Sequence, residues 1–112
     1  MQATFSALAE PNRLQIIQLL RQKPLAVGEI VDQLGLRQPQ VSKHLRVLSD
    51  AGLVEVRPVA QQRIYALRSE PLKELDTWLE QFRRSWDDRF DRFDDVLREQ
   101  KEKREKRNAR NK

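Results

Sequence analysis

The sequence predicts a mainly α-helical fold that contains one small β-hairpin and ends in a long helix. Three observations support this prediction. In most of the 112-residue chain, apolar residues recur at steps of three and four, which is the period of an amphipathic helix. Residues 53–57 and 63–67 are instead rich in Val, Ile and Tyr, as in paired strands. An apolar stripe over residues 72–97 indicates one long final helix.

Two short helices are predicted at the start of the chain. Residues 4–9 form the first. The i, i+3 spacing of Leu14, Ile17 and Leu20 predicts the second, over about residues 12–22.

The next two predicted helices are separated by a short turn. Apolar spacing over residues 27–34 predicts about two helical turns, and Gly35 follows where a left-handed cap belongs. A further helix is predicted over residues 38–49. Two helices joined by a short turn that contains glycine form a helix-turn-helix.

The second helix of this pair has one apolar face and one polar, basic face. Taking Val41 as zero and about 100° per residue, Leu45 and Leu48 fall within about 40° of it. The other side and its flank carry Gln40, Ser42, Lys43 and Arg46. In the DNA major groove, glutamine pairs with adenine, and arginine or lysine pairs with guanine. The pattern therefore predicts a DNA-recognition helix.

A β-hairpin is predicted directly after the helix pair, which makes the fold a winged helix. Gly52 closes the preceding helix, and Val54 and Val56 share one face of the first strand. Pro58 is expected to end the strand pairing, which leaves residues 58–62 as the loop. The wing is expected to contact DNA through Arg57, Gln61, Gln62 and Arg63. The alternative is a hairpin that is only structural.

The final helix is expected to begin near Pro71 and to form a dimer interface. Its apolar stripe, with Trp78 beside it, has coiled-coil-like spacing and consists of Leu72, Leu75, Leu79, Phe82, Trp86, Phe90, Phe93 and Leu97. A stripe about 39 Å long exceeds what such a small domain can cover, because a helix rises 1.5 Å per residue. A second copy of the chain is the simplest partner.

The net charge of +5 is distributed in three blocks. Residues 13–68 carry nine basic and four acidic groups, residues 70–97 carry five and nine, and residues 98–112 carry eight and three. A basic middle is the expected footprint of a phosphate-binding surface. We divide the chain into a DNA-binding and dimerisation domain, residues 1–97, and a basic tail, residues 98–112.

The basic tail is interpreted as a helical extension or as a disordered segment. If it is helical, Glu99–Lys103 and Glu102–Lys106 are favourable i, i+4 ion pairs. Its role is either to keep the protein soluble or to attract DNA without sequence preference.

No cofactor, metal or catalytic site is predicted. The chain has no Cys and one His, and it contains neither a Ser–His–Asp set nor a phosphate-binding glycine loop, so it is not expected to be an enzyme. A cluster of carboxylates on the last helix is interpreted as a solvated face: Asp87, Asp88, Asp91, Asp94 and Asp95. Without a secretion signal or an apolar run of membrane-spanning length, a cytoplasmic location is expected.

The sequence resembles the ArsR/SmtB family of small bacterial winged-helix repressors. The likeness extends from about Phe5 to Leu97 and rests on the segments ALAEPNRLQIIQLL, LAVGEIVDQLGLRQPQVSKHLRVLSDAGLVEVR and RIYAL. It implies the element order ααααββα, a homodimer and a palindromic operator, usually in the protein's own promoter. The implied dimer interface lies on the first and last helices and includes Phe5, Leu8, Leu72, Leu75, Leu79, Phe82, Trp86, Phe90 and Phe93.

The resemblance also implies which residues approach DNA: Arg37, Gln38, Gln40, Ser42, Lys43, His44 and Arg46. Arg37 stands where relatives have a serine helix cap, so a cap worth about 1 kcal/mol is lost. His44 has a second interpretation, as a packed or capping side chain. The wing lacks the tip glycine that many relatives have.

Metal sensing is not implied for this chain. One family site uses cysteines at positions that correspond to Ala26 and Gly28, which have no donor atoms. Another site uses histidines and carboxylates on the last helix, which has no histidine here. The likeness is therefore to the metal-independent, autorepressor-type members.

These observations together predict a sequence-specific, double-stranded DNA-binding transcriptional repressor that acts as a homodimer. Two alternatives stay open. One is a winged helix that serves only as a protein-interaction module. The other is a DNA-binding regulator with a small-molecule inducer in the dimer cleft, near Trp78, Phe82 and Trp86.

Overall fold

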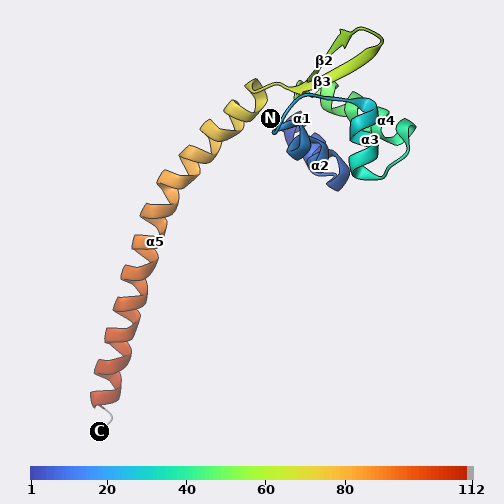
Figure 1. The fold of residues 1–112 in the computed structure, drawn as a ribbon. Helices are drawn as coiled ribbons and strands as arrows, with labels where there is room; N and C mark the ends of the chain where they lie inside the picture. The colour runs from blue at the N-terminus through green and yellow to red at the C-terminus, as the bar shows by residue number, and fades with distance from the viewer. Residues whose placement is uncertain (111–112) are drawn as a thin grey trace. The chain divides into compact units, whose positions relative to one another are not determined.

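The computed structural model describes residues 1–110 and contains five helices and a three-stranded sheet within them (Figure 1). In chain order these elements are α1 (Gln2–Leu8), α2 (Pro11–Leu20), β1 (Leu25–Ala26), α3 (Val27–Leu34), α4 (Gln38–Asp50), β2 (Val54–Val59), β3 (Gln62–Leu67) and α5 (Glu70–Arg110). The predicted order of helices and hairpin is confirmed, with β1 added. The chain divides into an N-terminal unit, Met1–Leu75, and a C-terminal unit that begins at Asp76.

The core of the N-terminal unit lies between α2, α3, α4 and the first residues of the sheet. Ile16, Ile30 and Leu45 are completely buried, one from each of the three helices. Leu14, which was expected on the apolar face of α2, is 42% exposed, and Ile16 occupies the core instead. The i, i+3 spacing predicted the position of the helix correctly, but it wrongly predicted Leu14 as a buried residue.

A polar network fixes the junction between α1 and α2. The carboxylate of Glu10, the N-cap of α2, accepts a hydrogen bond from the backbone N–H of Arg13 at 2.9 Å. The Arg13 guanidinium donates in turn to the carbonyl oxygens of Ala7 (2.7 Å) and Ser6 (3.1 Å). These bonds satisfy groups that the end of one helix and the start of the next leave without intrahelical partners.

The sheet has the order β1-β3-β2, so β3 is central. Strand β1 was not predicted from the sequence, and it pairs Leu25 with Tyr65 and Ala26 with Ile64. Pro58 does not end the pairing of β2 with β3, because it lies opposite Arg63 within the ladder. Proline is tolerated there because β2 is an edge strand, where one row of backbone groups needs no strand partner.

The hairpin turn is shorter than expected. Val59 pairs with Gln62, so the loop consists of Ala60 and Gln61 rather than five residues. Ala60 has a φ of 55°, in the left-handed region that favours glycine. The missing tip glycine therefore leaves an alanine in a conformation that costs a residue with a Cβ about 1 kcal/mol.

Helix α5 includes the basic tail as far as Arg110, so among the described residues the tail is helical. None of its residues is buried. Within residues 1–110, the expected ion pairs Glu99–Lys103 and Glu102–Lys106 do not form. Exposed pairs of this kind gain little over the solvation of the separate charges. Residues 111–112 of the predicted tail lie outside the described part.

Candidate nucleic-acid interface

Helix α4 has the two faces that its sequence predicts. Val41, Leu45 and Leu48 have 0% exposure and anchor the helix in the core. Several of the expected DNA-contacting side chains are exposed to solvent: Arg37, Gln38, Gln40, Ser42, Lys43 and Arg46. Because the apolar side is fixed by packing, the polar side of α4 is held in one orientation.

The start of α4 is stabilised by a glutamine rather than by the residue at its N-cap. The side-chain oxygen of Gln40 accepts a hydrogen bond from the backbone N–H of Arg37 at 3.2 Å. This is one half of a capping box. The expected loss of a side-chain cap at Arg37 is confirmed, since its guanidinium has only donors and makes no cap hydrogen bond. In the protein alone, the Oε1 atom of Gln40 therefore already accepts a hydrogen bond from the backbone of Arg37.

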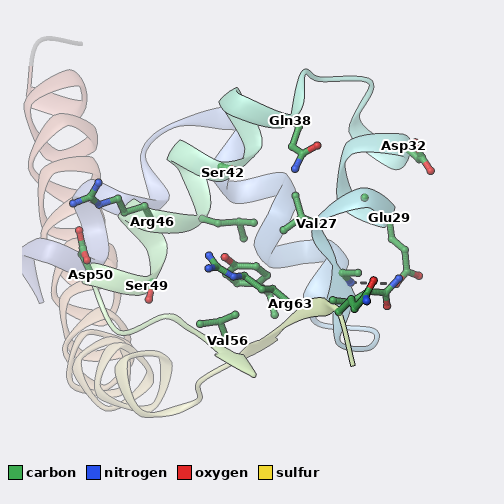
Figure 2. Close-up of a pocket in the computed structure, with 16 residues that line it drawn as sticks. Val27, Glu29, Asp32, Gln38, Ser42, Arg46, Ser49, Asp50, Val56 and Arg63 are labelled. Atoms are coloured by element: carbon green, nitrogen blue, oxygen red, sulfur yellow. Dashed lines mark hydrogen bonds between the residues drawn. The ribbon is translucent and has the colours of Figure 1, made fainter. Parts of the chain in front are cut away.

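Helix α4 and the hairpin face each other across an open groove of about 850 Å³ (Figure 2). Six of the eleven predicted DNA-contacting residues line it: Gln38, Ser42 and Arg46 from α4, and Gln61, Gln62 and Arg63 from the hairpin. Figure 2 shows Glu29 and Asp32 of α3 at one end of this groove and Arg46 at the other. The groove thus brings together polar side chains of α4 and the hairpin that lie 15 to 25 residues apart in sequence.

The other predicted residues lie outside this groove. Arg37, Gln40 and Lys43 are exposed on α4 but do not line it. Arg57 on β2 is also exposed, and its guanidinium contacts the Glu55 carboxylate at 3.3 Å. Such an exposed pair is weak enough to exchange for a phosphate.

His44 lies apart from the exposed polar face of α4. Its Nδ1 atom is 3.7 Å from Oε2 of Glu10, and its side chain is 20% exposed. The contact links α4 to the N-cap of α2. Of the two interpretations of His44, this geometry supports the packed one.

Several groove-lining residues were not singled out from the sequence. Glu29 accepts a hydrogen bond from the Ala26 N–H at 3.1 Å and so caps α3. Asp32 and Asp50 also line the groove. Asp50 is the last residue of α4, whereas Glu29 and Asp32 reach the groove because α3 packs against α4.

Comparisons with known proteins agree with this architecture. A family model described as "Bacterial regulatory protein, arsR family" matches residues 10–56. The HTH-type transcriptional regulator Rv2034 of Mycobacterium tuberculosis is 42% identical over 78 residues, which cover 70% of this chain and 73% of that protein. This chain belongs to the ArsR family. It is a transcriptional regulator, not an enzyme, and its fold is a winged helix-turn-helix.

Solved structures of ArsR-family proteins and similar regulators have the same fold. HlyU from Vibrio cholerae has a TM-score of 0.61 at 36% identity, covering 71% of this chain and 87% of that one. An ArsR-like transcriptional regulator from Rhodococcus has a TM-score of 0.73 at 24% identity, covering 86% and 88%. The latter likeness concerns the fold alone.

The two metal sites described above for other family members lack their ligand residues in this chain. Ala26 and Gly28 offer no ligand atoms, and α5 has no histidine. Within residues 1–110, no three His, Cys, Asp or Glu side chains are grouped so that they could hold a metal ion. In the same part of the chain, no helix is long and apolar enough to cross a membrane.

Proposed function

We propose that this ArsR-family regulator is a homodimeric repressor that binds a palindromic operator in its own promoter, without sensing a metal. The observation that carries the proposal is the groove between α4 and the hairpin. It combines amide, hydroxyl and guanidinium groups on a helix whose opposite face is fully buried. Amides and guanidinium groups are those that contact base edges and phosphates in DNA.

The side chains of α4 have different roles in this proposal. Gln38 is exposed and lines the groove, and its amide can pair bidentately with adenine. Gln40 is assigned mainly to positioning, because a bidentate contact would require its Oε1 atom to leave the Arg37 N–H. Lys43 is assigned to a phosphate. His44 is left out of the contact set because it faces Glu10.

The proposed dimer rests on the apolar stripe of α5. Phe82, Trp86, Phe90 and Phe93 are between 39% and 65% exposed in the single chain. Leu8 and Leu72 of the predicted interface are instead partly buried against the core. An aromatic stripe of this length is unusual on a protein that works alone. A two-fold dimer would place two recognition helices about 34–36 Å apart, in successive major grooves.

Repression is proposed from similarity to known regulators, whereas the absence of metal sensing is proposed from the missing ligand residues. The chain is similar to the transcriptional repressor SdpR of Bacillus subtilis, at 27% identity over 82 residues, and to the transcriptional activator HlyU of Vibrio cholerae, at 42% over 67. A dimer on a promoter blocks transcription by occupying it, which favours repression as the simpler mechanism. Metal independence is proposed because the two family sites lack ligand atoms.

Titration of DNA from upstream of the gene tests the proposal. Lys43→Ala should weaken binding to every sequence and reduce the salt dependence by about one phosphate contact. Gln38→Ala should instead reduce discrimination between the operator and single-base variants, by about 1–3 kcal/mol at one position. Lys23→Ala removes an exposed basic residue that lies on neither α4 nor the hairpin, so it is the matched control. Equal affinity and footprint for all three variants would refute the proposed interface.

A further inference from the structure

The last three turns of α5 carry a basic face that the DNA-binding groove does not explain. Taking Leu97 as zero and about 100° per residue, Lys101, Lys103, Arg104 and Arg107 fall within an arc of about 160°. They border a common hollow on the helix together with Leu97 and Gln100. The three glutamates of this segment fall outside the arc: Glu99, Glu102 and Glu105. The glutamates are therefore confined to the rest of the helix surface, which also carries Arg98, Lys106 and Arg110.

This basic face is not neutralised within the described part of the chain. Upstream on α5, Arg83 contacts the carboxylates of Asp76 and Glu80, and Arg98 contacts Asp95. By contrast, none of the four basic residues of the face forms an ion pair within residues 1–110. Their positive charges remain available to an external anion.

The composition of the face indicates what kind of partner fits it. The apolar stripe of α5 ends at Leu97, and Ala109 is the sole apolar residue over 98–110. Protein–protein interfaces have apolar centres and few lysines. Interfaces with DNA are polar and strongly basic. A lysine- and arginine-rich face that has Leu97 as its one apolar neighbour in the hollow therefore matches a nucleic-acid backbone better than a protein surface.

We infer that this basic face is a second DNA contact, which binds phosphates without sequence preference. The helix rise places successive basic residues of this face about 4.5 Å apart along the axis, in the order Lys101, Arg104, Arg107. Over the corresponding 9 Å of duplex, several phosphates are presented, since DNA carries one charge per about 1.7 Å of its axis. The face adds affinity for any DNA, while base choice stays with α4. The inference rests on the proposed DNA-binding function.

The test uses the full-length protein and a pair of charge-matched double variants. Lys101→Gln with Arg104→Gln removes two positive charges from the basic face. Arg98→Gln with Lys106→Gln removes two from outside the arc and serves as the control. Glutamine is a good helix former, so the helix content measured by circular dichroism should be equal in both. Affinity is measured against salt for the operator and for an unrelated duplex of the same length.

The face variant should bind both duplexes more weakly, with an unchanged ratio between them. Its plot of log K against log salt should be less steep by about 1.8 per chain, since each phosphate contact contributes about 0.9. The control variant should retain the wild-type slope. Equal losses in the two variants would overturn the inference, because they would indicate only a general effect of net charge. Unchanged binding by the face variant would overturn it as well.

Two further readouts separate this inference from its alternatives. If Lys43→Ala weakens binding while the face variant does not, the inference fails and the proposed function stands. If the wild-type protein binds no DNA, the proposed function itself fails. Sedimentation without DNA should give the same assembly for both double variants. A change of assembly in the face variant alone would assign the face to a second copy of the chain and so refute a DNA contact.

Discussion

The two units of this protein differ in where their apolar side chains lie, buried in the N-terminal unit and exposed on α5. The N-terminal unit buries its apolar residues within one chain, and Ile16, Ile30 and Leu45 are fully enclosed. Helix α5 buries none, and Phe90 is 65% exposed. The first unit therefore contains the interactions that its fold requires. The apolar stripe of the second is accounted for only if another surface covers it, and in our proposal that surface is a second copy.

The largest effect is expected from a cavity in the N-terminal unit. Leu45→Ala removes a side chain with 0% exposure and should lower the free energy of unfolding by about 2–5 kcal/mol. Urea unfolding followed by circular dichroism measures this loss. Leu14→Ala, at a residue that is 42% exposed, is the matched control and should cost far less. Similar losses at the two positions would contradict the assignment of the core.

A charge on the stripe of α5 should act on association rather than on folding of the N-terminal unit. Phe82→Glu and Trp86→Glu each place a carboxylate on the proposed interface and should weaken dimerisation by about 2 kcal/mol or more per copy. Sedimentation should then detect monomers. Gln81→Glu adds the same charge next to Phe82 but off the stripe, and should leave the dimer intact. A Phe82→Glu protein that is still dimeric would exclude this interface.

The smallest expected effect lies at the hairpin turn and has the opposite sign. Ala60→Gly removes a Cβ from a residue with a φ of 55° and should stabilise the N-terminal unit by about 0.5–1 kcal/mol. Ala66→Gly, within β3, should destabilise by a similar amount, because glycine loses more entropy in a strand. Thermal unfolding of both variants provides the comparison. A loss of stability in both would show that the turn is not strained.

The helical part of the fold could be predicted because its signals are local. The positions of Val41, Leu45 and Leu48 along α4 already specified its buried face, and Gly35 has the left-handed φ of 67° expected of a helix cap. Strand β1 could not be predicted in this way, because a strand of two residues is too short to show an alternation of apolar and polar side chains. Leu25 and Ala26 form a strand only through pairing with residues nearly 40 positions later.

The candidate site shows the same limit. The sequence identified the exposed residues of α4, since each lies at a fixed angle from the apolar face. It did not reveal that His44 is beside Glu10, 34 residues earlier, or that Glu29 and Asp32 reach the groove. It also misjudged Pro58, because the rule that proline ends pairing depends on whether the strand is central or at an edge.

The hydrogen bond from the Arg37 N–H to Gln40 restricts how this regulator could acquire a new target. Glutamate would serve at position 40 as a capping residue, yet in the interface that we propose it would bring a negative charge towards phosphates. Most other side chains would give up the cap. Gln38, which has no such structural duty in the described part of the chain, can vary without that penalty. Divergence in operator preference is therefore expected to begin at position 38 and to leave position 40 unchanged.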